Sequence, residues 1–260
     1  MKRIEPAKQD ARAGLSREIR EFWTDNVNAE RIMGRPVTRS QRGEEQYFTD
    51  LETQRYRSHR HLLPWISAME SSGSVLEIGC GVGLDTFQMA TRGMQVKAVD
   101  LTDVGVKTAS KRLTKHKLPA TFAAADACNL PFGNDTFNYV YSFGVLHHVA
   151  DTDRSIHEVY RVLKKGGEAR IMLYHRRSIN EIVHRLTRTP FEEKDKCCPV
   201  VRRFTIEEVR KLFDPFSQVD IFLDYAYGEG YGRLFKLTPA IIHRFLSRRW
   251  GWHIMITAKK

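Results

Sequence analysis

Three glycines at alternate positions, preceded by a carboxylate, are the clearest chemical signal in the sequence. The stretch 75–85 reads Val-Leu-Glu-Ile-Gly-Cys-Gly-Val-Gly-Leu-Asp, so an apolar run delivers Glu77 and then Gly79, Gly81 and Gly83. Glycine accepts positive φ and has no side chain that would hold a ligand away from the backbone. The order of apolar run, glycine turn and helical pattern predicts a site for a nucleotide-like ligand.

Carboxylates around this turn narrow the ligand class. The spacing Glu-x-Gly-x-Gly-x-Gly differs from the Gly-x-Gly-x-x-Gly of dinucleotide-binding enzymes, and Glu77 would repel a pyrophosphate but suit a cation. Asp100 ends the next apolar run, where its carboxylate can accept hydrogen bonds from ribose hydroxyls. Asp126 follows a third run and can accept from an exocyclic adenine amine. These acids favour an adenosine-containing cation over NAD.

The elements that must position these residues alternate between strand and helix patterns. Short apolar strands separated by helices predict a parallel sheet that is covered on both faces, with its ligand at the carboxyl ends of the strands. Lys164 to Gly167 are predicted to end a helix, and Pro64 is predicted to break one that runs from residue 44 to 69. We expect strands at 75–78, 95–99, 120–124, 137–142, 168–174, 218–223 and 252–258, and helices at 85–92, 104–116, 152–163 and 206–213.

The regular pattern is flanked and interrupted by other segments. Residues 1–69 are predicted to form an N-terminal helical cap, in which Leu15, Ile19 and Trp23 have helical spacing. Residues 70–260 form the predicted nucleotide-binding domain, with insertions at 175–204 and 224–250. We expect the cap and the insertions to build a lid over the strand ends.

Composition bounds the setting of this chemistry. The 260 residues carry a net charge of +11, but the basic residues are scattered, so nucleic acid is a less favoured partner than a small anionic molecule. The four cysteines form no C-x-x-C pair, which fits a reducing compartment. No apolar run is long enough to span a bilayer and no signal-peptide core is visible, so we predict a cytoplasmic protein without a membrane partner.

Six motifs in order resemble the class I S-adenosylmethionine-dependent methyltransferases, in particular the branch of ubiquinone, menaquinone and natural-product enzymes. The resemblance spans residues 70–175. It implies a Rossmann-like α/β fold with a seven-stranded, mostly parallel sheet, helices on both faces and an antiparallel last strand. The motifs are 75–83, Val99-Asp100-Leu101, 125–132, Phe137-Asn138-Tyr139-Val140, Gly144-Val145-Leu146-His147-His148-Val149 and 161–167.

The resemblance also implies S-adenosyl-L-methionine as the cofactor and assigns residues to it. The glycines would let the backbone pass close to the methionine part and the sulfonium of the cofactor, and Glu77 would orient the glycine turn. Asp100 would hold the ribose, with Leu101 packed on the adenine. The full cofactor set is Glu77, Gly79, Gly81, Gly83, Asp100, Leu101, Asp126, Ala127, Phe143 and Gly144.

Methyl transfer is an in-line displacement, and a base is needed only if the nucleophile must lose a proton. Candidates at the strand ends are His147, Tyr174 and His175, because a histidine can be tuned to act near neutral pH. The alternative for His147 is a packing role beside the cofactor, and Tyr174 and His175 could simply end a strand. No metal-binding constellation is present in the sequence, so we expect no required metal.

The acceptor is less defined than the cofactor. We expect a small molecule, with Tyr47, Tyr56 and Arg57 on the cap as substrate residues, although packing and a solvated face are the alternatives. Aromatic side chains in the insertions would suit an apolar or aromatic acceptor, and arginines an anionic group. The same aromatic side chains could instead be core, or the contact surface of a homo-oligomer. They are Phe191, Tyr225, Tyr227, Tyr231 and Phe235.

Three other functions fit parts of the sequence. The net charge would suit an RNA methyltransferase, but Ser142-Phe143-Gly144-Val145 stands where an Asn-Pro-Pro-Tyr-like motif would bind an acceptor amine. A cyclase of the same fold could bind the cofactor without transferring its methyl group. Metalloid methylation would use cysteine thiolates, but the arrangement of Cys197 and Cys198 does not match that class. We therefore favour a small-molecule methyltransferase in secondary-metabolite or quinone-like biosynthesis.

Overall fold

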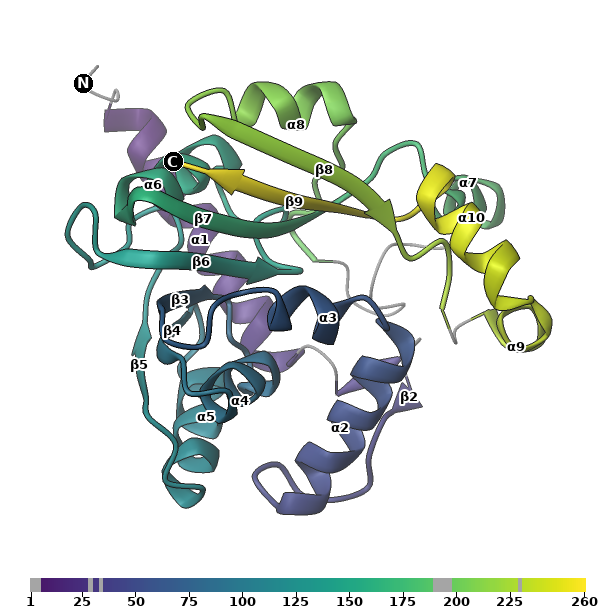
Figure 1. Cartoon of the computed structure of the whole chain (residues 1–260), viewed down its shortest axis with the longest axis horizontal. Coiled ribbons are helices and arrows are strands. Elements are labelled where there is room, and N and C mark those ends of the chain that lie inside the picture. The colour runs from purple at the N-terminus through teal and green to yellow at the C-terminus, as the bar shows by residue number, and fades with distance from the viewer. Residues whose placement is uncertain (1–5, 28–29, 33–34, 189–197, 229–230) are drawn as a thin grey trace.

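A seven-stranded mixed sheet forms the centre of the molecule (Figure 1). The computed structural model describes residues 6–27, 30–32, 35–188, 198–228 and 231–260. The strand order is β5-β4-β3-β6-β7-β9-β8, and β9 is antiparallel to both of its neighbours. The Rossmann-like prediction, including the antiparallel last strand, is confirmed. The strands are β3 (Ser74–Ile78), β4 (Gln95–Asp100), β5 (Ala120–Ala124), β6 (Phe137–Phe143), β7 (Leu163–Tyr174), β8 (Gln218–Asp224) and β9 (His253–Lys259).

Alternate residues of the strands pack into two separate cores. Leu76 and Ile78 of β3 face the core that contains Ile156 of α6 (Thr152–Val162) and Val209 of α8 (Ile206–Leu212). Val75 faces the other core, which holds residues of α3 (Leu62–Ser67), α4 (Leu84–Thr91) and α5 (Asp103–Lys115). Because successive strand side chains point to opposite faces, this division places helices on both faces of the sheet.

Two boundaries differ from the sequence prediction. Pro64 lies in the first turn of α3, where no intrahelical partner is needed for a backbone N–H, so it does not break this helix. Lys164 to Gly167 lie within β7 and do not form the end of α6. The reason is pairing with the C-terminus: the Gly166 N–H donates to the Lys260 carbonyl and the Lys260 N–H donates to Gly167, both at 3.0 Å.

The remaining elements lie at the carboxyl ends of the strands or around them. At the N-terminus are α1 (Pro6–Asp25), a short pair of strands β1 (Arg31–Ile32) and β2 (Arg35–Pro36), and α2 (Glu45–Ser58). The insertions contain α7 (Ile179–Thr187), α9 (Arg233–Leu237) and α10 (Ala240–Trp250), which Figure 1 shows at one end of the molecule. None of the helices in the described ranges is long and apolar enough to cross a membrane.

Candidate active site

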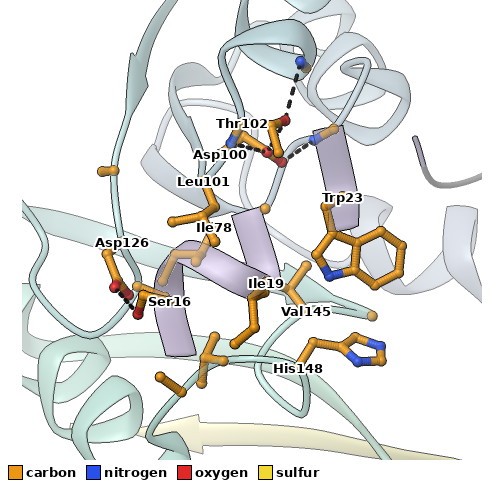
Figure 2. A pocket seen from close by; sticks show the side chains of 18 of the residues that line it. Ser16, Ile19, Trp23, Ile78, Asp100, Leu101, Thr102, Asp126, Val145 and His148 are labelled. Carbon is orange, nitrogen blue, oxygen red and sulfur yellow. Dashed lines mark hydrogen bonds between the residues drawn. The ribbon is translucent and has the colours of Figure 1, made fainter. Parts of the chain in front are cut away.

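The first hollow lies at the carboxyl ends of β3, β4, β5 and β6, beneath helix α1 (Figure 2). It encloses about 800 Å³, including space open to solvent. Seven of the ten predicted cofactor residues line it: Gly79, Gly81, Asp100, Leu101, Asp126, Ala127 and Gly144. Its mixture of apolar walls with a few polar groups is that of a small-molecule site.

Asp100 ties the second strand to the glycine turn. Its Oδ2 accepts a hydrogen bond from the Gly81 N–H at 2.8 Å, and its Oδ1 accepts from the backbone N–H and the hydroxyl of Thr102 at 2.8 and 2.7 Å. Thr102 also caps the N-terminus of α5. Asp100 is therefore held at the strand end by three hydrogen bonds, and its carboxylate is exposed to the hollow.

Two of the glycines are required by close packing. A Cβ on Gly79 would lie 2.2 Å from a methyl carbon of Val145, and the residue has φ +78°. A Cβ on Gly83 would lie 2.7 Å from the Cβ of Ala109 in α5. Gly79 thus lets the glycine turn pass close to the loop after β6. Gly83 lets α4 and α5 approach each other, and Gly83 does not line the first hollow.

Helix α1 lies in the cap that was expected to form part of a lid, and it contributes an entire wall of the hollow, although none of its residues was among the predicted site residues. Ser16, Ile19 and Trp23 line the hollow, and the Ser16 hydroxyl donates to Asp126 Oδ2 at 2.8 Å (Figure 2). The Trp23 ring meets the edge of His148 at a centroid distance of 5.2 Å. The helical spacing of these residues was visible, but spacing alone does not show which surface a helix covers.

A second, smaller hollow continues from Gly79 and Gly81 toward α2. It is lined by Glu77, Phe143, Arg55 and Asp85 in addition to the glycine turn. Asp85 collects hydrogen bonds from Arg55 Nε at 2.9 Å, Tyr56 Oη at 2.9 Å and Tyr141 Oη at 2.8 Å. This places Tyr56 in a buried ionic network behind the glycine turn.

The two carboxylates of this hollow differ in charge. Burial, reinforced by the negative charge of Asp85, raises the pKa of Glu77 to about 8. Burial opposes ionisation of Asp85 too, but the Arg55 guanidinium outweighs it and holds the pKa of Asp85 below its usual value. The Thr86 hydroxyl donates to Glu77. Glu77 is therefore mostly protonated at pH 7. A cation that binds beside it would favour the ionised form, which carries a negative charge.

A cluster of aromatic and histidine rings borders the second hollow. His59 and His253 lie with their ring planes parallel to Tyr225, at centroid distances of 4.7 and 4.6 Å. The edge of Phe143 meets His59 and His253 at 5.6 and 5.2 Å. Burial lowers the pKa of His59 to about 3, with the charge of Arg55 adding to the effect, so this ring is neutral at pH 7.

A wide basic groove lies on the other side of this ring cluster, between the α2–α3 connection and α10. It is bordered by His61 and by Asp224, whose carboxylate lies 3.5 Å from the His61 ring. Its volume is about 2430 Å³, including open solvent. Its cationic side chains are Arg57, Arg60, Lys236, Arg244 and Arg248, and its aromatic ones include Trp65, Phe222, Tyr225 and Phe235.

Of the predicted catalytic residues, His147 and His175 are buried and Tyr174 is half-buried. His147 has no exposed surface and does not line these three hollows. Its ring packs on Tyr174 at a centroid distance of 3.7 Å, and burial holds its pKa well below the usual value. His175 lies 3.0 Å from the Gly251 carbonyl through Nδ1. This geometry favours packing roles for all three, and their catalytic role stays a prediction.

The predicted substrate residues separate. Arg57 lines the basic groove, whereas Tyr56 is bound to Asp85. Tyr47 donates to Glu30 at 2.5 Å and packs in the core that supports Val82 in the glycine turn.

Phe191 and Cys197 fall outside the described residues; Cys198 is buried beside the Val200 carbonyl.

Several functional candidates escaped the sequence reasoning. Arg55, His59, His61, Asp224 and His253 come together from α2, the α2–α3 connection, β8 and β9, with His61 and His253 in contact at 3.3 Å across 192 positions. Arg57 and Arg60 are the groove cations that lie outside the insertions. Within the described ranges no group of three or more histidine, cysteine or carboxylate side chains is arranged to hold a metal ion.

Comparison with known proteins agrees with this geometry. Residues 76–171 match the family model described as a methyltransferase domain. In this central part the chain is similar to the class I S-adenosylmethionine-dependent methyltransferases. The matched range begins in β3 and ends in β7, so it covers the strands that build the first hollow and leaves out most of the basic groove.

The alignments with two curated relatives cover less than half of the chain. The chain is 35% identical over 117 residues to a 2-phytyl-1,4-naphtoquinone methyltransferase of Nostoc punctiforme, covering 43% of the chain and 51% of that relative. It is 34% identical over 110 residues to the biotin biosynthesis bifunctional protein of Cellvibrio japonicus, covering 42% of the chain and 21% of that relative. The alignments thus span about half of these relatives or less.

Solved structures extend the likeness of the fold. A S-adenosylmethionine-dependent methyltransferase of Thermotoga maritima has a TM-score of 0.60 at 19% identity, covering 80% of this chain and 95% of the other. The [4+2]-cyclase SpnF has a TM-score of 0.60 at 17% identity, covering 94% and 96%. At these identities the likeness shows the fold, which serves both methyl transfer and other reactions.

Proposed function

We propose that the chain transfers a methyl group from S-adenosyl-L-methionine to a small molecule that carries an anionic group and an apolar or aromatic body. The observation that carries the proposal is the placement of two unlike sites on either side of Phe143. This ring lines the second hollow, which contains Glu77 and Asp85. It also packs near His61, which lines the basic groove, with the two ring centroids 6.0 Å apart. A cationic donor and an anionic acceptor would each meet complementary charge.

The residues of the first two hollows fit this cofactor. Asp100 would accept from the ribose hydroxyls and Asp126 from the adenine edge, while Leu101 and Ile19 provide apolar walls. Glu77 and the turn at Gly79 would receive the methionine part, whose ammonium group would favour the ionised form of Glu77. The cofactor supplies an activated methyl group on a sulfonium sulfur.

The protein's own contribution is positioning and exclusion of water. Helix α1 covers the first hollow, and the ring cluster of Phe143, His59 and Tyr225 borders the second hollow through Phe143 and the groove through Tyr225. Bringing two reactants together in line and dry can supply much of the acceleration of a displacement. If the acceptor must lose a proton, His61 beside Asp224 is the groove residue that we propose receives it.

The acceptor charge is argued from the groove. Arg57, Arg60 and Arg244 line it, and among the lining residues that the structure describes Asp224 is the one carboxylate. Such a surface attracts carboxylates and phosphates. We keep the division into a cap at 1–69 and a domain at 70–260, the cytoplasmic location and a homo-oligomeric state as predictions.

Incubation with methyl-deuterated S-adenosyl-L-methionine and a cell metabolite extract tests the proposal. We expect one or more acidic metabolites to gain a single labelled methyl group, with S-adenosylhomocysteine formed in equal amount, and no change after nuclease treatment. Loss of product on nuclease treatment would favour RNA as the acceptor. Tight cofactor binding without S-adenosylhomocysteine would contradict methyl transfer and favour a cyclase-like reaction.

A further inference from the structure

The exposed apolar side chains of this protein are concentrated on the inserted helices. Within the described ranges, every leucine, isoleucine, phenylalanine and tryptophan that is classed as exposed lies on α7, α9 or α10. Their exposed fractions range from 40% for Trp250 to 79% for Leu186. The set is Ile182, Leu186, Leu234, Leu237, Ile241, Ile242, Phe245 and Trp250. Such a concentration marks an interaction surface more often than chance.

The same helices carry positive charge. Helices α9 and α10 contain no aspartate or glutamate, and Glu181 of α7 pairs with Arg203 at 3.2 Å. The cations are interleaved with the apolar residues, and all are exposed: Arg185, Arg188, Arg233, Lys236, Arg244, Arg248 and Arg249. We call this set of exposed apolar and basic side chains on α7, α9 and α10 the helical surface.

Contacts on the inner side fix which face of α10 points outward. The Ser247 hydroxyl accepts from the Ala226 N–H at 3.0 Å, and His243 Nε2 lies 2.8 Å from the Tyr227 carbonyl. Ile241, Phe245 and Arg249 are spaced by four residues on the opposite side and are exposed. Apolar and basic side chains are therefore mixed on the outward face of α10.

The three helices belong to one end of the molecule. The Tyr231 hydroxyl, just before α9, donates to Asn180 in the first turn of α7. The Tyr227 and Thr238 hydroxyls are 2.7 Å apart, which joins the end of α9 to the segment after β8. Figure 1 shows α7, α9 and α10 together at the edge away from β5.

We propose that the helical surface binds the surface of an anionic lipid bilayer. Aliphatic side chains would enter the boundary between headgroups and acyl chains, and the flanking cations would meet anionic headgroups. A second copy of the chain fits less well, because a self-complementary contact would bring seven cations on each side together. Nucleic acid would leave Leu186, Leu237 and Ile241 without an apolar partner. Peripheral binding of this kind requires no spanning helix.

Sedimentation with vesicles tests the proposal on the full chain. We expect binding to phosphatidylcholine vesicles that contain about one third phosphatidylglycerol, weaker binding to pure phosphatidylcholine, and loss of binding at high salt. Absence of sedimentation with the anionic vesicles would overturn the proposal.

Two variants separate the apolar and the charged contributions. The triple change Leu237→Ser, Ile241→Ser and Phe245→Ser removes exposed side chains only, and should weaken binding to anionic vesicles about tenfold or more. Arg185→Gln with Arg249→Gln should weaken it roughly fivefold for each cation removed. Lys107→Gln with Lys111→Gln, two exposed changes on α5, is the matched control and should leave binding unchanged.

Equal weakening by the α5 control would overturn the proposal, since it would indicate general charge attraction. So would unchanged binding in the triple serine variant, or a concentration-dependent dimer that this variant abolishes and that accounts for the sedimentation. Circular dichroism of each variant shows whether the fold is intact. Cofactor titration of the same samples reports separately on the two cofactor hollows, which no residue of the helical surface lines; Lys236, Arg244 and Arg248 of this surface also line the groove and are left unchanged in these variants.

Discussion

The two ends of the active site are built in different ways. The cofactor hollow consists of backbone and short acidic side chains from consecutive βα units, such as Gly79, Asp100 and Asp126. The acceptor groove consists of long basic and aromatic side chains from segments far apart, such as Arg60, Tyr225 and Arg244. Apart from the wall formed by α1, the first end lies within residues 76–171, which match the family model, and the second lies mostly outside them. The proposed donor site therefore rests mainly on the part of the chain that resembles known methyltransferases, and the proposed acceptor site mainly on parts outside it.

The largest effect is expected at the glycine turn. Gly79→Ala would place a Cβ 2.2 Å from Val145 at a residue with φ +78°, and should lower the free energy of unfolding by about 3 kcal/mol and cofactor affinity at least ~100-fold. Gly81→Ala is the control: φ is +50° and no atom lies within 4 Å, so a loss of about 1 kcal/mol is expected. Equal unfolding midpoints in denaturant for the two variants would contradict the packing argument.

The next largest effect is expected for substitution of Glu77, which should raise the free energy of unfolding and weaken cofactor binding. Its pKa is about 8 in the fold against the ordinary 4.5, so the fold binds a proton that the unfolded chain has lost between these values. The stability that comes from the protonated form is complete below pH 4.5 and is lost as pH rises to 8. Glu77→Gln should therefore raise the free energy of unfolding at pH 8 by a few kcal/mol.

The same change should weaken cofactor binding, because a neutral amide cannot pair with the ammonium group. Denaturant unfolding at pH 5 and pH 8, together with calorimetric titration, measures both effects. A variant that is less stable than the wild type at pH 8, or one that binds the cofactor more tightly, would show that Glu77 has another role.

Substitutions in the acceptor groove should change acceptor binding without changing cofactor binding at the donor site. Arg60→Gln with Arg244→Gln removes two exposed cations of the groove, and should raise the KM of an anionic acceptor about tenfold while leaving kcat and cofactor affinity unchanged. The paired control is again Lys107→Gln with Lys111→Gln. A parallel loss of cofactor affinity would mean that the two ends are not separable.

The smallest expected effect concerns the helix that covers the donor site. Ser16→Ala removes a hydrogen bond of 2.8 Å to Asp126, a partly buried contact, and should weaken cofactor binding by about 1 kcal/mol, or roughly fivefold. Calorimetry measures it directly, with Ser67→Ala on α3 as a serine that is remote from the hollow. No change in affinity would indicate that α1 does not close over the bound cofactor.

The contrast between the two ends also explains what the sequence could predict. Glu77, Gly79 and Asp100 follow strand ends at short spacings, and local pattern places such residues at one sheet edge. His61 and His253 meet across 192 positions, so only the tertiary structure brings them together. His147 was selected from a motif, but burial depends on what packs over it, here Tyr174 and His148. Helix α1 was visible as an amphipathic pattern without an indication of its partner.

The central claim is that the first hollow, beneath α1, binds S-adenosyl-L-methionine through Asp100. Calorimetric titration of the wild type and of Asp100→Ala tests it most directly. We predict one binding site per chain in the wild type and a loss of about 100-fold in the variant, since Asp100 holds the glycine turn and would also hold the ribose. No measurable binding by the wild type, or equal affinity in the two proteins, would contradict it.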